Sequence, residues 1–414
     1  MMAIQNFEAK LQSYARILVT RGINAQPGEV TVVYISVEQQ KFAHAIVDEL
    51  YKNGASRVIV QWQDDFLNRA GIVNNSLEAI DNPTPMTHAF AKFVGEELPN
   101  RLYITSKDPD SLTGVDPERI GRTIKANSLA MKPVSDASMS DKLAWCVAGA
   151  ASPAWAKKVF PGLGEDEAVE ALWNAIFSVA RIDVADPDQN WSDHLANLTV
   201  RADWLNEQAF DKLHFTDNGT DLEVGLPKGH IWGAASSLRQ ADNKVFIPNM
   251  PTEEIFTAPD FRRVNGVVSS TKPLVFAGTP ILDMVITFKD GKVVDYKASA
   301  GIEALEALLA TDEQSNFLGE VALVPDNTPI SQSNTLFYET LYDENASNHL
   351  AFGEAYPTTI QGGTDLDEEG LLAAGMNVSL THEDFMIGSK TTSIDGVKAD
   401  GTVVPIFRNG TWVD

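Results

Sequence analysis

The sequence predicts an α/β N-terminal domain built on a parallel sheet, followed by a mostly β C-terminal domain with a few helices. Three observations support this fold class. The chain has 414 residues, more than one hydrophobic core usually supports, so two domains are expected. The first 60 residues contain a strand–helix–strand pattern. After about residue 215 the pattern changes to short strand-like runs separated by turn residues.

Hydrophobic periodicity defines the N-terminal elements. Apolar residues over Phe7–Leu18 repeat on one helical face, and Gly22 ends that helix. Val30–Val37 is a near-continuous apolar run, as expected of a strand buried on both faces. A helix is expected over Gln40–Lys52 and a second strand over Arg57–Trp62. These elements together predict a βαβ unit and therefore a parallel sheet.

The rest of this half adds one strand and further helices. Leu102–Thr105 resembles a third strand, and Asp166–Arg181 keeps a helical period. The segment Asp186-Pro187-Asp188 has the composition of a domain boundary. We therefore expect an N-terminal α/β domain over residues 1–185 and a C-terminal, mostly β domain over residues 186–414.

The C-terminal half contains recurrent hairpin signals. Val285–Ala298 is split by Asp290-Gly291 into two alternating runs, which predicts a hairpin with a two-residue turn. Three similar turns are expected near the end of the chain, at Asp395-Gly396, Asp400-Gly401 and Asn409-Gly410.

The charge balance excludes several classes of partner. With 57 acidic and 32 basic residues, the formal net charge is −25, and the pI is near 4.6. Such a surface repels phosphate backbones and anionic headgroups, so neither nucleic acid nor a membrane is an expected partner. Met1–Phe7 lacks the features of a signal peptide, and no apolar run reaches the ~20 residues of a membrane span. A cytoplasmic location is expected.

Two chemistries are disfavoured by particular residues. The single cysteine, Cys146, excludes an intramolecular disulfide and a thiolate metal cluster, and its apolar neighbours indicate a buried thiol. The turn after the first strand, Ser36–Gln40, has no glycine and places a carboxylate where a phosphate would lie. This turn argues against a nucleotide site.

Two of the seven histidines have acidic neighbours at ligand spacing. His382 and Asp384 lie two residues apart, so in a strand they project from the same face and can reach one metal ion. The alternative is a solvated His and Asp on an exposed face. His349 follows Glu344 by five residues, so the two can converge in a helical turn or a compact loop.

Three further carboxylates have apolar surroundings. Glu253 and Glu254 lie between prolines and hydrophobic residues, where adjacent carboxylates need a cation to neutralise them. Glu320 enters an apolar strand, either as an edge residue or as a metal ligand. Oxygen and imidazole donors without thiolate suit zinc, manganese or cobalt, and four carboxylates with two histidines suffice for two ions.

At this point a family resemblance is identified. The run Asn249–Pro259 resembles the signature of the aminopeptidase T and aminopeptidase S metallopeptidase family. The remaining motifs occur in order: Gly319-Glu320, then Asp343–His349, then His382-Glu383-Asp384. The similarity covers nearly the whole chain.

The resemblance implies an enzyme that releases N-terminal amino acids from short peptides through a water activated by two metals, and whose members are dimers. It implies two divalent ions, whether zinc, cobalt, manganese or magnesium. It also implies a catalytic Tyr356 that donates a hydrogen bond to the oxyanion. Carried over residue by residue, the implied metal ligands are Glu254, Glu320, His349, His382 and Asp384, with Glu344 as a sixth.

Some alternatives stay open at this stage. Glu253 can act as the general base beside the metals, or it can serve a structural role by pairing with Arg262 or Arg263. The leading function is a metalloaminopeptidase. A metal-dependent amidohydrolase or esterase acting on a non-peptide substrate, and a non-catalytic metal-binding protein, are the alternatives.

Overall fold

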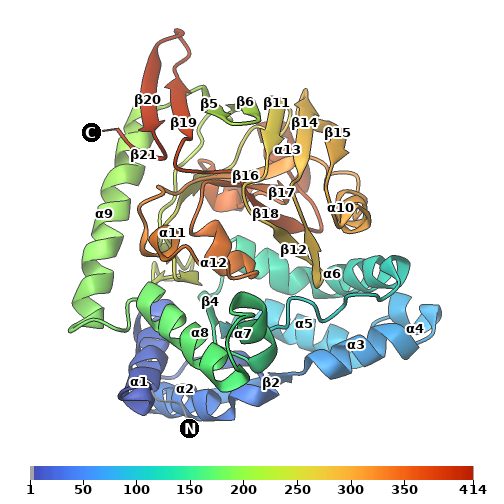
Figure 1. Ribbon diagram of the computed structural model, residues 1–414, viewed down its shortest axis with the longest axis vertical. Coiled ribbons are helices and arrows are strands. Elements are labelled where there is room, and N and C mark those ends of the chain that lie inside the picture. The colour runs from blue at the N-terminus through green and yellow to red at the C-terminus, as the bar shows by residue number, and fades with distance from the viewer. Residues whose placement is uncertain (1–3, 414) are drawn as a thin grey trace.

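The structure is a computed structural model that describes residues 4–413. Residues 1–3, which belong to the Met1–Phe7 segment expected to lack a signal peptide, lie outside this range. In Figure 1 the elements of the N-terminal half occupy the bottom of the molecule and those of the C-terminal half the top, and the long helix α9 (Pro187–Gln208) runs along one side. This helix begins at the boundary expected from the sequence, and the division into residues 1–185 and 186–414 stays a prediction.

The N-terminal half is built on a five-stranded parallel sheet in the order β2-β1-β3-β4-β9. Four strands come from this half, and the short β9 is contributed by the C-terminal half, at the start of the Asn249–Pro259 run. The strands are β1 (Val30–Ser36), β2 (Arg57–Gln63), β3 (Asn100–Thr105), β4 (Trp145–Gly149) and β9 (Asn249–Met250).

Helices cover this sheet. Those of the N-terminal half are α1 (Phe7–Ile17), α2 (Gln40–Lys52), α3 (Asp65–Asn74), α4 (Leu77–Asp81), α5 (Pro85–Glu97), α6 (Pro117–Met139), α7 (Pro153–Val159) and α8 (Glu165–Val179). The expected helix–strand–helix–strand order is confirmed, with α2 at the predicted bounds. The parallel pairing of β1 with β2 and β3 confirms the predicted sheet.

The C-terminal half consists mainly of antiparallel strands. One sheet has four strands, β10 (Ile255–Thr257), β16 (Leu318–Leu323), β17 (His349–Gly353) and β18 (His382–Met386), in that order. An eight-stranded sheet has the order β15-β14-β11-β6-β5-β19-β20-β21. Its members are β5 (Lys212–Asp217), β6 (Thr220–Gly225), β11 (Val264–Ser269), β14 (Val285–Lys289), β15 (Lys292–Lys297), β19 (Ser393–Val397), β20 (Val403–Arg408) and β21 (Thr411–Trp412).

The smaller elements complete this half. Two short hairpins are formed by β7 (Ser237–Leu238) with β8 (Val245–Phe246) and by β12 (Leu274–Phe276) with β13 (Thr279–Ile281). Besides α9, the α-helices of this half are α10 (Ile302–Leu309), α11 (Pro329–Ser333), α12 (Thr340–Glu344) and α13 (Glu368–Ala374).

The predicted turns have mixed outcomes. Asp290 and Gly291 join β14 to β15 with positive φ at both residues, which confirms the hairpin. Asp400-Gly401 and Asn409-Gly410 also connect consecutive strands. The turn expected at Asp395-Gly396 is wrong, because both residues lie inside β19. There Gly396 packs so closely on the Phe210 ring that a Cβ would lie 2.4 Å from it, so this glycine serves packing rather than a turn.

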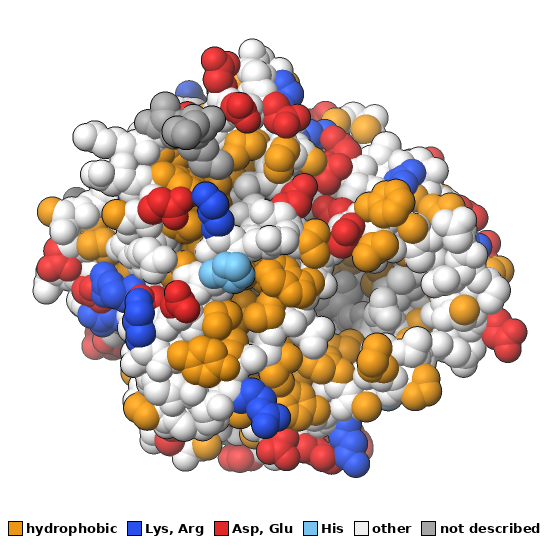
Figure 2. Space-filling model, turned by 90° about the horizontal axis from the view of Figure 1, so that it is seen from below, with side chains coloured by type: hydrophobic (Ala, Val, Ile, Leu, Met, Phe, Trp, Pro, Cys, Tyr) orange, Lys and Arg blue, Asp and Glu red, His pale blue; other side chains and the backbone are white. Residues whose placement is uncertain are grey.

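Each half has its own hydrophobic core. The first is centred on aromatic side chains such as Trp155 and Trp191 and extends to Tyr342 from the C-terminal half, whose ring lies 5.6 Å from that of Trp155. The second core fills the space between the antiparallel sheets and α10. The lower face of the molecule shows apolar side chains interspersed with acidic and basic ones (Figure 2). Within residues 4–413, no helix combines the length and apolar character of a membrane span.

Candidate metal centre

Three neighbouring strands supply most of the donor side chains. Glu320 lies on β16, His349 begins β17, and His382 and Asp384 lie on β18. Residues paired directly across antiparallel strands share a face. Glu320 and Asp384 both pair with Ala351, from opposite sides, so these donors face the same way. The prediction that His382 and Asp384 share one face of a strand is confirmed, since both lie in β18.

The donor face of this sheet carries small residues beside the donors on β16 and β17, with Phe256 on β10 and Met386 on β18 as the large ones. Ala351 and Gly353 follow His349 on β17 at every second position and therefore lie on the same face. Ala322 of β16 pairs with His349 and lies on that face as well. The opposite face carries large apolar side chains that belong to the C-terminal core, among them Leu350, Phe352 and Phe385. One face therefore anchors the sheet in the core, and the other leaves room above its backbone.

A β-bulge directs Glu320. The register between β16 and β17 shifts between Leu318 and Glu320, at Gly319. A Cβ on Gly319 would lie 2.3 Å from the Glu354 carbonyl oxygen, so only glycine fits. Bulges re-aim the side chains that follow them. The Gly319-Glu320 pair singled out in the sequence is thus a local device that turns one carboxylate toward the other donors.

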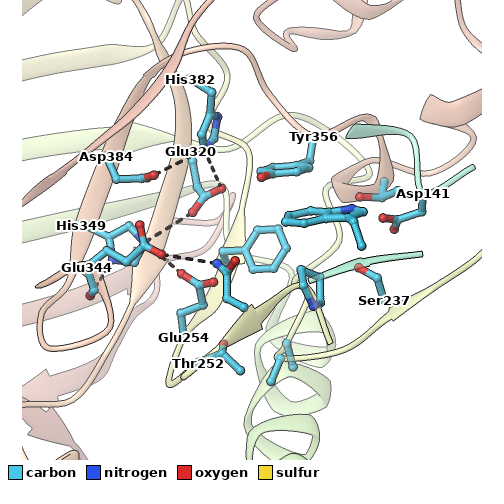
Figure 3. A pocket seen from close by; sticks show the side chains of 17 residues that line it. Asp141, Ser237, Thr252, Glu254, Glu320, Glu344, His349, Tyr356, His382 and Asp384 are labelled. Carbon is cyan, nitrogen blue, oxygen red and sulfur yellow. Dashed lines mark hydrogen bonds and ion pairs between the residues drawn. The ribbon is translucent and has the colours of Figure 1, made fainter. Parts of the chain in front are cut away.

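The donors form two groups that share one residue. Ligand atoms of Glu254, Glu320 and His349 lie within 4.8 Å of one another, and so do those of Glu320, His382 and Asp384. Figure 3 shows these side chains converging, with Glu320 between the two histidines. His349 Nε2 lies 3.0 Å from Glu254 Oε2 and 3.5 Å from Glu320 Oε1. His382 Nε2 lies 3.7 Å from Glu320 Oε2 and 3.6 Å from Asp384 Oδ2.

Backbone carbonyls orient both imidazoles. His349 Nδ1 lies 3.1 Å from the Glu344 oxygen and 3.0 Å from the Ser347 oxygen. His382 Nδ1 lies 2.7 Å from the Glu354 oxygen. Because a carbonyl oxygen only accepts, each Nδ1 carries the proton, and in the neutral ring each Nε2 presents a lone pair. These lone pairs point at carboxylates, which also only accept, and a cation between them satisfies both.

The electrostatics of the cluster are those of an acidic site without an internal counter-ion. Burial raises the pKa of Glu320 to about 7. Burial, together with neighbouring carboxylates, raises the pKa of Glu344 well above its ordinary value. Burial opposes protonation of His349, but Glu254 and Glu320 outweigh it and raise its pKa. In the absence of another positive charge, these side chains therefore bind protons more tightly than they would in water.

The donor set fits divalent cations. Among the described residues, the pocket around the cluster is lined by the three carboxylates and two histidines of the donor groups, by Glu344 and Asp141, and by no lysine or arginine. His349 Nε2 and Asp384 Oδ1 are buried and make no hydrogen bond with any described residue. Oxygen and nitrogen donors suit zinc, cobalt, manganese and magnesium. The buried, unpartnered donor atoms are accounted for once ions are bound.

Tyr356 lies at the edge of the cluster. Its ring meets the His382 imidazole edge to face at 5.1 Å and contacts the Phe256 ring at 5.7 Å. Figure 3 shows its hydroxyl directed toward the donor residues. Burial and the surrounding carboxylates raise the pKa of Tyr356 well above its ordinary value, so the hydroxyl keeps its proton. It is positioned as a hydrogen-bond donor.

Glu253 lies next to Glu254 but faces another partner. Arg181 Nη2 donates to Glu253 Oε1 at 2.6 Å, and both side chains are buried. His194 Nε2 lies 3.6 Å from Glu253 Oε2. Burial raises the pKa of Glu253 to about 7, although Arg181 lowers it. Glu253 is not among the residues that line the metal pocket.

The expected structural partners of Glu253 are wrong. Arg262 pairs with Asp260 at 2.8 Å, and Arg263 pairs with Asp211 at 2.7 Å. The actual partner, Arg181, is 72 positions away in the sequence, directly after α8. It lies in the left-handed region, at φ 57°, and no local pattern marks it.

Two asparagines were also missed by sequence reasoning. Asn345 accepts a hydrogen bond from the Glu253 amide at 2.7 Å and donates to Glu344 Oε1 at 3.2 Å. Asn249 donates to the same Glu344 oxygen at 3.4 Å. Both residues lie inside motifs recognised in the sequence, so their position in those motifs was the available signal. Asn345 thereby ties the Glu253-Glu254 segment to the loop that precedes β17.

Comparison with known proteins identifies the family. The profile of the family described as thermophilic metalloprotease (M29) matches residues 7–412. Aminopeptidase PepS of Streptococcus thermophilus is 48% identical over 413 residues, covering 100% of both chains. Aminopeptidase AmpS of Bacillus subtilis is 45% identical and covers 99% of this chain and 100% of its own.

A solved structure extends the similarity to the fold. Wild-type AmpT from Thermus thermophilus matches with a TM-score of 0.89 and 37% identity, over 99% of this chain and 100% of that chain. The predicted fold class, with a parallel N-terminal sheet and a mostly antiparallel C-terminal half, is thereby confirmed, and so is the resemblance inferred from the motifs. Family profile, full-length relatives and fold agree, and the chain therefore belongs to the thermophilic metalloprotease (M29) family and is a peptide hydrolase.

Proposed function

We propose that the protein is a metal-dependent aminopeptidase that releases N-terminal amino acids from short peptides with the help of two divalent ions. The observation that carries this proposal is the pair of donor groups that share Glu320. A shared carboxylate between two sets of donors is the arrangement that brings two ions close enough to act on one substrate. The names of the full-length relatives, which are aminopeptidases, support the same reaction.

Each donor group is assigned one ion. Glu254, Glu320 and His349 would hold the first, and Glu320, His382 and Asp384 the second. Zinc, cobalt, manganese and magnesium are the ions that this donor set suits. When bound, such ions polarise the scissile carbonyl, activate the attacking water and bind the free amine of the substrate.

Two side chains outside the donor groups supply a hydrogen-bond donor and a proton-transfer group. Tyr356, which keeps its proton, donates a hydrogen bond to the oxygen that gains negative charge in the transition state. Glu344 lines the pocket but belongs to neither donor group, although the sequence suggested it as a sixth ligand. We assign to Glu344 the transfer of a proton from the attacking water to the leaving amine.

For Glu253 we propose a positioning role in place of the general-base role expected from the sequence. Its carboxylate is engaged by Arg181, and its amide by Asn345. These contacts hold the backbone that presents Glu254 to the donor cluster. A residue fixed in this way acts on the reaction through its neighbour.

Chelation and reconstitution test the function. Metal-free protein is expected to be inactive on aminoacyl anilides and to regain activity with zinc, cobalt or manganese, saturating at two ions per chain. Full activity in rigorously metal-free protein would rule out the proposal. Recovery of full activity at one ion per chain would contradict the two-metal part of the proposal.

Blocked substrates separate aminopeptidase activity from the alternatives. N-acetylated peptides and casein are expected to resist cleavage, because an aminopeptidase requires the free amine. Hydrolysis of acetylated peptides would indicate an endopeptidase. Hydrolysis of simple esters with no action on peptides would indicate an esterase.

Two further expectations remain proposals, a homodimer and a cytoplasmic location. The dimer rests on the family resemblance, and sedimentation or light scattering of the purified protein measures it directly. A monomer at working concentrations would contradict it.

A further inference from the structure

A second cavity adjoins the metal pocket. It has a volume of about 500 Å³ and lies between β3, α6 and the segment that ends at Tyr356. Trp145 and Tyr356 line both this cavity and the metal pocket, so the two spaces meet at these rings. A peptide held at the metal pocket therefore has space beyond the scissile bond. We call this space the distal cavity.

Strand β3 contributes a cation to the distal cavity. Side chains alternate along a strand, and Arg101, Tyr103 and Thr105 line the cavity, whereas Leu102 and Ile104 are buried in the N-terminal core. Arg101 pairs in register with Trp145 on β4, one of the two residues shared with the metal pocket. Arg101 is thus placed beside the junction of the two spaces.

The other charged groups of the distal cavity have partners or lose their charge. Lys132 pairs with Asp136 at 2.8 Å and with Glu368 at 3.1 Å. Lys107 lies near the Glu339 carboxylate and hydrogen bonds to Tyr103.

The cavity also contains carboxyl groups. Glu354 lies near Lys132, and burial raises the pKa of Glu339 to about 7. Glu339 is therefore partly neutral at physiological pH, and its repulsion of an anion is reduced.

Arg101 has no carboxylate partner within residues 4–413. Its Nη1 donates to Ser138 Oγ at 2.8 Å, and its guanidinium lies 5.1 Å from the centre of the Tyr34 ring. Its Nε is buried and has no hydrogen-bond partner among the described residues. A guanidinium that lines the cavity and is held only by a ring and one hydroxyl keeps further N–H donors, whose planar arrangement matches the two oxygens of a carboxylate.

We propose that the distal cavity receives the part of the peptide beyond the scissile bond and that Arg101 binds its free C-terminal carboxylate. The inference rests on the proposed aminopeptidase function. A short peptide carries an amine at one end and a carboxylate at the other. The metal pocket would bind the amine, and Arg101 would bind the carboxylate. The protein would then prefer peptides with a free acid over the same peptides with an amide end, at the length that spans the two sites.

Paired substrates test the proposal. Leucyl peptides of two to five residues are prepared as free acids and as C-terminal amides, and kcat and KM are measured with the metal-loaded protein. For Arg101→Gln, kcat/KM on the acid of the preferred length is expected to fall about 10- to 100-fold, mainly through KM. Values for the matching amide should stay within about twofold. Arg101→Lys should retain part of the preference for the acid.

The ratio of acid to amide within one variant makes the test independent of folding or metal loss. Arg57→Gln, the same change at an exposed position on β2 of the same sheet, is the matched control and should leave the ratio unchanged. An equal ratio in wild type and Arg101→Gln at every length would overturn the proposal. A leucyl anilide, which has no carboxylate, reports the proposed function separately: if the anilide is cleaved and the ratio does not move, only the carboxylate site is lost.

Discussion

Two neighbouring carboxylates, Glu253 and Glu254, are buried side by side and are neutralised in different ways. Glu253 meets Arg181, a cation of the chain itself, at 2.6 Å. Glu254 faces His349 and the other acidic donors, in a pocket whose described lining has no lysine or arginine. The Arg181–Glu253 pair is complete within the protein. The donor cluster around Glu254 has no such cation among the described lining residues.

This difference separates a structural ion pair from a functional one. An internal pair that loses one member leaves an uncompensated buried charge, so its loss is expected to appear in stability. A buried cluster of acidic donors without bound ions already destabilises the fold. Losing one donor is therefore expected to lower metal content and turnover rather than the free energy of unfolding. The predictions below test this separation.

The largest effect is expected for Glu320→Ala. Glu320 belongs to both donor groups, so its removal should reduce metal content from two ions to one or none. Turnover should fall by at least about 10³-fold, since bound ions contribute several kcal/mol of charge stabilisation. Metal analysis and kcat on an aminoacyl anilide measure both. Two tightly bound ions in this variant would show that Glu320 is not the shared ligand.

A smaller effect, and one on stability, is expected for Arg181→Met. Removing one partner of a buried pair costs about 3–5 kcal/mol in the free energy of unfolding. The double variant Arg181→Met/Glu253→Gln should recover part of that loss, because it no longer leaves a buried charge unpaired. Denaturant unfolding measures the difference. If the single variant matches wild type in stability, the pair is not the self-contained unit described above.

The pH dependence of the metal-free protein gives the third test. Burial raises the pKa of Glu320 to about 7 from an ordinary value of 4.5, so the folded state binds more protons between these values. Stability should therefore fall as the pH rises from 4.5 to 7, by on the order of 3 kcal/mol for this group. The raised pKa of His349 acts in the same direction.

Loading with metal should remove this loss, because bound cations replace the protons. Melting temperatures at pH 5 and pH 8, with and without saturating ions, test the sign. Equal slopes in the two forms would show that the donors carry no raised pKa values.

The smallest effect is expected for Glu253→Gln. As a positioning residue, Glu253 can be replaced by a near-isosteric amide with a loss of turnover below about tenfold. As the general base, its loss would lower kcat by about 10²–10⁴-fold. Measuring kcat at full metal occupancy distinguishes the two. Glu344→Gln is the companion variant, expected to keep both ions and to lose the larger factor.

Much of the fold could be predicted from local patterns. The strand over Val30–Ser36 and the helix over Gln40–Lys52 follow from runs of adjacent residues, and the hairpin at Asp290-Gly291 from a turn that requires positive φ. Asp395-Gly396 shows the limit of such reasoning. The same dipeptide lies inside a strand there, because contact with the distant Phe210 ring and not a turn requires the glycine.

The candidate site divides in the same way. The donors that occur in compact motifs were identified from the sequence. Arg181 and Arg101 were not identified, because the role of each depends on contacts with residues that are distant in the sequence. Arg181 meets Glu253 only when the N-terminal half packs on the signature segment. Arg101 has no carboxylate partner within residues 4–413, and it lines a cavity that β3 and α6 form together.

The donor sheet also limits how genes for this protein can change. Glu320 and Asp384 flank Ala351 in one row across three strands, and neighbouring residues of each strand point into the core. Inserting or deleting one codon within β16, β17 or β18 would turn donors toward the core and apolar side chains toward the ions. Length variation among descendants of this gene should therefore accumulate in the connections, while the spacing from His349 to Gly353 and from His382 to Met386 stays constant.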